Sequence, residues 1–244
     1  MTEQIKSELY TEIKNILTYS EFDFSEETLQ RFTLYFSDLL TKNKVMNLTA
    51  ITEPAEVAEL HLFDSLTLLD VLPDYFDLDL IDVGTGAGLP GIPLKIARPE
   101  IRLCLLDATK KRLDFLDQCL KRLYLTDHAK TVHARAEDAA KDPKLREKFD
   151  IATARAVAPL NVLAEYCLPF VKLNGFFIAM KGPIGSELDQ AEQAISVLGG
   201  DLADVREFTL PVSKAERSLI IIQKISQTPK RFPRKAGTPK NNPL

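Results

Sequence analysis

The stretch with the clearest chemical signature is LIDVGTGAGLPGIP, residues 80–93. An apolar run ends at Asp82, and glycines follow at positions 84, 86 and 88 before a helix-like segment. Glycine lets the backbone approach a ligand closely and tolerates positive φ angles. In an open parallel sheet, ligands bind at the carboxyl ends of the strands, and the N-terminus of the following helix faces them. The stretch therefore predicts a site for a nucleotide-like molecule.

Two ligand classes compete for this turn. A G-x-G-x-x-G pattern begins at Gly86, and Asp107 follows about 20 residues on, an arrangement typical of dinucleotide sites. That pattern begins late, because the turn already starts at Gly84. The acidic residue followed by three alternate glycines, beginning at Asp82, fits better as the first motif of an S-adenosylmethionine site.

Charge separates the two ligands. Asp82 would repel a pyrophosphate, whereas S-adenosylmethionine offers a sulfonium, an ammonium and a ribose diol. Asp107 ends the next apolar strand, where its carboxylate can accept both ribose hydroxyls. Two other roles remain open: Asp82 could cap the turn, and Asp107 could cap the next helix, an end that we assign to Thr109.

Apolar periodicity predicts the elements that position these residues. Residues 1–72 have helical spacing, with helices expected from the N-terminus, from Ser25 and from Pro54. From residue 73 onward, strands alternate with amphipathic helices, which is typical of a parallel sheet covered on both faces. The last two strands predict an antiparallel hairpin at the sheet edge. Strands are expected at 78–83, 101–106, 130–134, 149–154, 175–180, 203–210 and 218–225, and helices at 89–98, 109–124, 160–172 and 186–198.

Composition indicates an intracellular protein. Hydrophobic residues make up 45% of the 244 residues, but no apolar run reaches the length of about 18–20 residues that spans a membrane. The N-terminus lacks a secretory signal pattern, and three cysteines without C-x-x-C spacing indicate reduced thiols in the cytoplasm. The three dispersed histidines make a zinc site unexpected. No extended apolar seam is left unassigned, so we expect a monomer.

The C-terminal segment 228–244 has its own charge. It carries five basic residues and no acidic one, whereas the rest of the chain has a net charge of −9. A basic, proline-rich segment without periodicity is expected to be disordered on its own. It can still bind phosphates electrostatically, although a solubilising role is the alternative.

Four segments in order carry a resemblance to a known family: DVGTGAGLPGIPLKI, LLDATKKRLDFL, ARAED and FDIATARAVAPL. They resemble the bacterial small-subunit ribosomal RNA guanine-N7 methyltransferases, the RsmG or GidB family. NKVMNLTAI, HLFDSL, ERSLIIIQK and the basic tail extend the resemblance over nearly the whole chain. It implies an α/β fold of the class I S-adenosylmethionine-dependent methyltransferases, Rossmann-like, with a mostly parallel seven-stranded sheet. An N-terminal helical cap is expected at 1–72 and the methyltransferase domain at 73–227.

The resemblance also implies S-adenosylmethionine as methyl donor and 16S ribosomal RNA, or the small ribosomal subunit, as partner. Carried over position by position, the cofactor contacts are Gly84, Gly86, Leu89, Asp107, Ala136, Glu137 and Arg155. Ala154 stands where many members have serine, so no hydroxyl role is expected there.

Guanine N7 has an in-plane lone pair and no proton, so its methylation needs alignment rather than a general base. The ATARA loop after the fourth strand fits this chemistry, because it lacks the Asn/Asp-Pro-Pro-Tyr/Phe motif used on exocyclic amines. It also lacks the Pro-Cys used on pyrimidine rings, and Cys167 falls within a predicted helix as a core residue.

Basic residues at the ligand edge are candidates for RNA contact: Arg135, Arg155, Lys181 and Arg217, with Lys110, Lys111 and Arg112 at a helix N-terminus. Cations at that end are disfavoured by roughly 0.3–1 kcal/mol each, which favours a phosphate-binding role there. Structural salt bridges or solvated charges are the alternatives.

Polar residues of the cap have a more structural interpretation. His61, Asp64 and Ser65 share one helix face, and we favour a hydrogen-bonded joint between cap and sheet over catalysis. Asn47 either faces RNA or caps the next segment.

Three other functions remain open. The chain could methylate a protein or small molecule, act as an NAD-binding dehydrogenase through the later glycine pattern, or bind RNA without catalysis. Binding of S-adenosylmethionine but not NAD would separate the first two.

Overall fold

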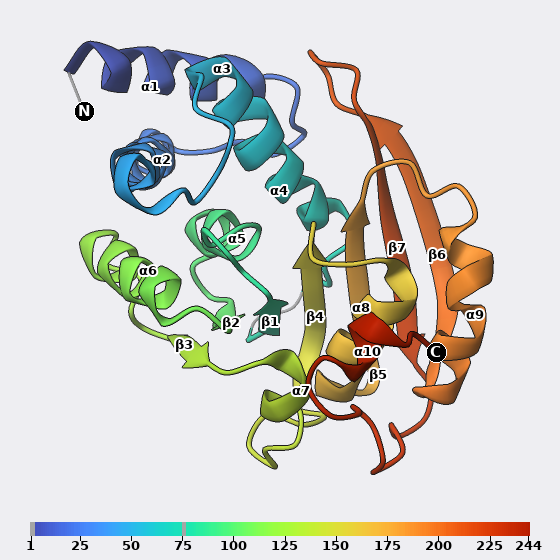
Figure 1. The fold of residues 1–244 in the computed structure, drawn as a ribbon. Coiled ribbons are helices and arrows are strands. Elements are labelled where there is room, and N and C mark those ends of the chain that lie inside the picture. Colours follow the sequence, from blue (N-terminus) through green and yellow to red (C-terminus); the bar gives the residue numbers. More distant parts are fainter. Residues whose placement is uncertain (1–2, 75–76) are drawn as a thin grey trace.

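The computed structural model describes residues 3–74 and 77–244. In these residues, seven strands form one sheet with the order β3-β2-β1-β4-β5-β7-β6 (Figure 1). β1 to β5 are parallel, and β7 runs antiparallel to β5 and β6, so the predicted edge hairpin is confirmed. Strand order reverses between β1 and β4, and the glycine turn follows β1. The strands are β1 Asp79–Val83, β2 Arg102–Asp107, β3 Ala129–His133, β4 Phe149–Arg155, β5 Val171–Lys181, β6 Gly200–Thr209 and β7 Glu216–Lys224.

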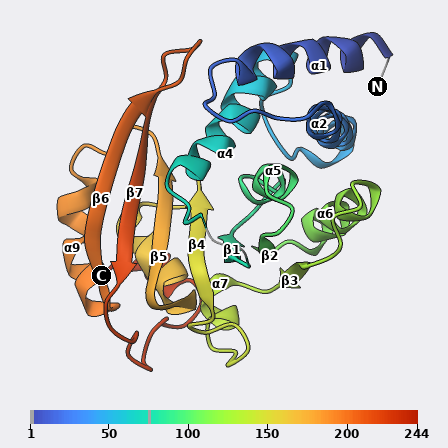
Figure 2. The same cartoon turned by 180° about the vertical axis from the view of Figure 1, so that it is seen from behind.

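Helices cover both faces of the sheet (Figures 1 and 2). One face packs against the cap together with α5 and α6, and the other against α7, α8, α9 and the C-terminal segment. The α-helices are α1 Glu3–Leu17, α2 Glu26–Met46, α3 Pro54–Glu56, α4 Asp64–Leu66, α5 Gly91–Ala97, α6 Lys110–Arg122, α7 Ala136–Ala139, α8 Leu160–Cys167, α9 Glu187–Val197 and α10 Thr238–Asn241. None of the described helices is long and apolar enough to cross a membrane.

The predicted strands are all present, and the helix boundaries differ in instructive ways. Ser25 caps α2 as predicted, since its hydroxyl accepts the Thr28 N–H at 3.2 Å. The helix predicted from Pro54 is irregular, because a π-helical segment, Val57–Phe63, separates α3 from α4 and a 3₁₀ turn, Thr67–Asp70, follows. The helix predicted over 160–172 is too long: α8 ends at Cys167 and a 3₁₀ turn containing Pro169 leads into β5.

The cap and the sheet share one hydrophobic core. Apolar side chains of α2, including Phe36 and Leu39, belong to the same buried cluster as Leu80 of β1 and Leu105 of β2. All four side chains are fully buried. Residues 3–72 therefore pack as part of the methyltransferase core rather than around a core of their own.

The expectation that residues 228–244 are disordered is wrong. Phe232 is 5% exposed within the core of the α8 and α9 face, and α10 packs against α8. Arg234 forms an ion pair with Glu165 of α8 at 2.6 Å, and Glu165 is fully buried. The segment has too little apolar surface to fold alone. It is ordered on the domain because its Arg234 is the partner of the buried Glu165 carboxylate.

Candidate active site

The turn after β1 has the backbone shape that its glycines allow. Gly84, Gly86 and Gly88 have φ angles of 72°, 59° and 101°. The Gly84 N–H donates to the carbonyl of Leu106 at 2.8 Å, which fixes the turn against β2. A Cβ at Gly88 would lie 2.7 Å from Ile92 and 2.8 Å from Leu116. Both these contacts and the positive φ angle disfavour any side chain at this position. The turn is therefore rigid and narrow, and it presents backbone rather than side chains.

The buried side chain of Asp82 stabilises this turn through hydrogen bonds. Its Oδ2 accepts hydrogen bonds from the Thr85 hydroxyl at 2.6 Å and the Gly91 N–H at 3.0 Å, as the capping alternative predicts. Full burial raises the pKa of Asp82 to about 6, although these two hydrogen bonds and the nearby Arg155 each act to lower it. Its Oδ1 has no hydrogen-bond partner among the described residues. A buried carboxylate oxygen with unused capacity fits a cationic ligand beside the turn and disfavours a pyrophosphate.

Asp107 connects the turn to the second strand. Its Oδ2 accepts the Gly86 N–H at 3.0 Å, so two residues predicted to contact the cofactor are in direct contact. Its Oδ1 accepts the Thr109 N–H at 2.7 Å. Thr109 is the N-cap residue of α6, as predicted, although its side chain makes no capping hydrogen bond. Asp107 fixes the approach to that helix end instead, because a carboxylate readily binds a backbone N–H two residues on.

Ala136 and Glu137 begin α7, directly after β3, which pairs with β2. Glu137 is 4% exposed, and its Oε1 accepts the Gly237 N–H from the C-terminal segment at 2.8 Å. One oxygen of this predicted cofactor-binding carboxylate is therefore occupied by the C-terminal segment. Ala136 is the first residue of α7, the helix that follows β3.

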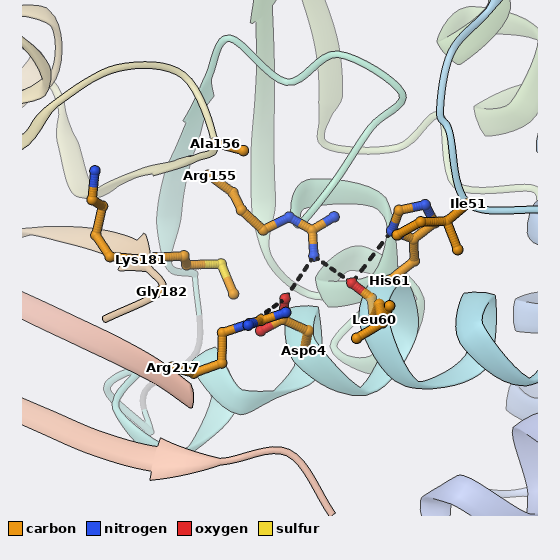
Figure 3. A pocket seen from close by; sticks show the side chains of 10 residues that line it. Ile51, Leu60, His61, Asp64, Arg155, Ala156, Lys181, Gly182 and Arg217 are labelled. Atoms are coloured by element: carbon orange, nitrogen blue, oxygen red, sulfur yellow. Dashed lines mark hydrogen bonds and ion pairs between the residues drawn. The ribbon is translucent and has the colours of Figure 1, made fainter. Parts of the chain in front are cut away.

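Arg155 ends β4 and lines a pocket of about 330 Å³ together with residues of the cap, β5 and β7 (Figure 3). Its Nη1 donates to the Leu60 carbonyl at 3.2 Å and lies 3.4 Å from Oδ2 of Asp64. Arg217 reaches the same carboxylate oxygen from β7, with Nε at 3.1 Å. Burial lowers the pKa of Arg155, and Asp64 opposes that shift. The predicted joint between cap and sheet is confirmed for Asp64, which links α4 to two strands.

His61 and Ser65 serve the cap rather than the sheet. The His61 Nε2 lies 2.8 Å from the Thr49 hydroxyl, and Ser65 Oγ donates to the His61 carbonyl at 2.5 Å. Burial, with a smaller effect from Arg155, lowers the pKa of His61 to about 4. Asn47 adopts a left-handed conformation and caps the preceding helix α2, not the next segment.

The remaining predicted RNA contacts are divided between paired and solvent-exposed side chains. Lys181 ends β5 and lines the pocket, but its amine points away from Asp64 to Glu187 at 2.8 Å (Figure 3). Lys110 pairs with Asp114 at 2.6 Å, and Arg112 lies 3.4 Å from Asp107. Arg135 and Lys111 are exposed. The structure thus brings Arg155, Arg217 and Lys181 to one pocket and leaves the α6 cations on a separate surface.

Two contributors to the site are absent from the sequence prediction. The Tyr35 hydroxyl donates to the Ala87 carbonyl in the glycine turn at 2.7 Å, although the residues are 52 positions apart. The loop after β4 also touches this turn, since a Cβ at Gly84 would lie 2.9 Å from Val157. No local pattern marks either residue, because both contacts depend on tertiary packing.

The sheet order, the reversed β7 and the glycine turn with its two acidic residues define a class I S-adenosylmethionine-dependent methyltransferase. Solved structures support this fold. An O-methyltransferase from Bacillus cereus in complex with SAH matches with a TM-score of 0.56 at 15% identity, covering 87% of this chain and 100% of that one. The [4+2]-cyclase SpnF matches with a TM-score of 0.55 at 14% identity, over 78% of this chain and 94% of that one.

The chain belongs to the GidB family, rRNA small subunit methyltransferase G, which matches residues 28–220. A relative named ribosomal RNA small subunit methyltransferase G from Lactobacillus acidophilus is 49% identical over 231 residues, covering 93% of this chain and 96% of the relative. One of the same name from Acetivibrio thermocellus is 49% identical over 222 residues, or 91% of each chain.

Proposed function

We propose that this protein transfers a methyl group from S-adenosylmethionine to N7 of a guanosine in 16S ribosomal RNA, as a cytoplasmic monomer. The names of its relatives support the small ribosomal subunit or its RNA as the substrate. The observation that carries the N7 assignment is the chemistry of the pocket that Arg155, Arg217 and Asp64 line. It offers positive charge and fixed geometry but no strong, available base.

The residues proposed to hold the methyl donor surround the turn on three strands. They are Gly84, Gly86 and Leu89 in the turn, Asp107 at the end of β2, Ala136 and Glu137 after β3, and Arg155 at the end of β4. The unused Oδ1 of Asp82 and the positive-φ glycine backbone of the turn support the fit. S-adenosylmethionine supplies, when bound, a methyl group on a positively charged sulfur.

The chemistry of N7 matches what the pocket residues offer. The N7 lone pair forms the new bond to carbon while the carbon–sulfur electron pair returns to sulfur, so the positive charge moves to the purine and no proton is released. Asp64, the one carboxylate among the described residues that line the pocket, is bound to Arg155 and Arg217. His61, with a pKa of about 4, is a weak base at neutral pH. Alignment of the reacting atoms is therefore the main contribution of the protein.

Basic side chains are proposed to place the RNA. Arg155, Arg217 and Lys181 line the pocket, where an arginine can donate to the guanine O6 or to a phosphate. Arg135, Lys110 and Lys111 are proposed as outer contacts to phosphates, since all three are exposed.

Methyl transfer with product analysis tests the proposal. Small ribosomal subunits and their stripped RNA, both from a strain lacking this gene, are incubated with labelled S-adenosylmethionine and the labelled nucleoside is identified. We expect 7-methylguanosine, and we expect Asp107→Ala to abolish it. Label in another nucleoside would overturn the N7 assignment, and binding of the donor without RNA labelling would overturn the RNA substrate.

A further inference from the structure

The C-terminal segment 228–244 is anchored along its length. Arg146 donates to the carbonyls of Thr228 and Phe232 at 2.7 and 2.9 Å, which holds the beginning of the segment. Further along, the Arg234 guanidinium and backbone N–H both bind the buried Glu165 carboxylate. Without the segment, Glu165 would be a buried charge with no partner, so docking is strongly favoured.

Docking leaves four cations of the segment in solvent. Lys230, Arg231, Lys235 and Lys240 are exposed, whereas Arg234 forms the ion pair with Glu165. In the part of the chain that the structure describes, no carboxylate pairs with any of these four side chains. They place four positive charges on one anchored segment of a protein whose net charge is −4. We call these four residues the tail surface.

The tail surface adjoins the elements proposed to hold the methyl donor. Gly237, between Lys235 and Lys240, donates its N–H to Glu137 of α7 at 2.8 Å. Arg135, also exposed, caps that same short helix and extends the positive charge toward Ala136. Figure 1 shows α10 lying against α8, on the face of the sheet opposite the cap.

From this placement we infer that the tail surface binds phosphates of the substrate RNA outside the nucleotide that is methylated. The inference rests on the proposed function and extends it to a second RNA-contacting face. Lysine and arginine side chains on an anchored backbone suit this role, since the anchoring removes part of the ordering cost that a disordered tail would meet on binding. The contacts are to phosphates, so they add affinity without reading sequence.

Charge removal tests the tail surface. The variant carries Lys230→Gln, Arg231→Gln, Lys235→Gln and Lys240→Gln, and the matched control carries Lys6→Gln, Lys14→Gln, Lys44→Gln and Lys121→Gln. The control residues are exposed on α1, α2 and α6, and their loss changes net charge equally. Binding of deproteinised 16S ribosomal RNA is measured for both and for the wild type between about 50 and 300 mM salt, a range over which phosphate contacts weaken strongly.

We expect the tail variant to bind RNA at least about tenfold more weakly than the control at low salt, with a salt slope reduced by about 0.7 for each lost contact. Its affinity for S-adenosylmethionine and its melting temperature should match those of the control. Equal RNA affinity and equal salt slope in the two variants would overturn the proposal that the tail surface binds RNA phosphates. That result differs from failure of the proposed function, in which the wild type itself methylates no RNA.

Discussion

Tyr35 of α2 holds the glycine turn by donating its phenolic proton to the carbonyl of Ala87 at 2.7 Å. The ring is fully buried, and its hydroxyl lies 3.0 Å from where a Cβ of Gly88 would be. The cap therefore supports the glycine turn directly, and that turn is the backbone proposed to bind S-adenosylmethionine.

Tyr35→Phe should weaken cofactor binding more than it slows the chemical step. The change leaves the Ala87 carbonyl buried without its partner, which costs about 1–3 kcal/mol of stability. We expect a several-fold higher dissociation constant for S-adenosylmethionine by calorimetry, with kcat at saturating donor nearly unchanged. Tyr124→Phe is the matched control, because Tyr124 is 87% exposed. Wild-type affinity in Tyr35→Phe would show that the turn keeps its shape without this bond.

Asp64→Asn should lower both stability and activity. The carboxylate binds Arg155 and Arg217 from two strands, and both partners are buried or half-buried in the structure. Loss of its charge should cost about 1.5–3 kcal/mol in denaturant unfolding, because hydrogen bonds to charged groups are worth this much. We also expect a lower kcat/KM, since Arg155 would lose its fixed orientation. Asp114→Asn, at the exposed pair with Lys110, should change neither quantity measurably.

Much of this architecture could be predicted from local patterns. Strand–helix alternation is visible in the sequence because the central strands β1, β2 and β4 are buried on both faces. Gly86 and Asp107 meet because parallel strands place their carboxyl ends together. Contacts between distant positions could not be predicted. Glu165 and Arg234 are 69 residues apart, and neither periodicity nor composition reveals that a buried charge on α8 requires a partner from the tail.

Asp82 should give the stability of the protein a characteristic pH dependence. Its pKa is raised to about 6 in the fold, above the ordinary value of 3.8, so the folded state holds a proton that the unfolded chain has released. Stability from this group therefore falls as the pH rises from about 4 through 6, by about 3 kcal/mol in total.

Comparison with Asp82→Asn isolates this effect, because asparagine stays neutral throughout. The wild type should lose stability relative to the variant between pH 4 and 7 (about 3 kcal/mol), and the difference should be constant above that range. Urea unfolding at a series of pH values measures it. A difference that stays flat, or that grows in favour of the wild type with rising pH, would contradict a raised pKa at Asp82.

Arg234→Ala should separate the anchoring role of the tail from its exposed charge. The substitution leaves the Glu165 carboxylate, 1% exposed as a side chain, without its cation, and an uncompensated buried charge costs about 3–5 kcal/mol. Arg231→Ala removes an equal charge from an exposed side chain whose guanidinium lies 5.1 Å from the centre of the Phe232 ring, so its effect should stay within about 0.5 kcal/mol. Thermal unfolding measures both, and limited proteolysis reports on the tail directly. We expect rapid cleavage within 228–244 only in Arg234→Ala. Equal stability and equal cleavage in the two variants would mean that the segment is not held by Glu165.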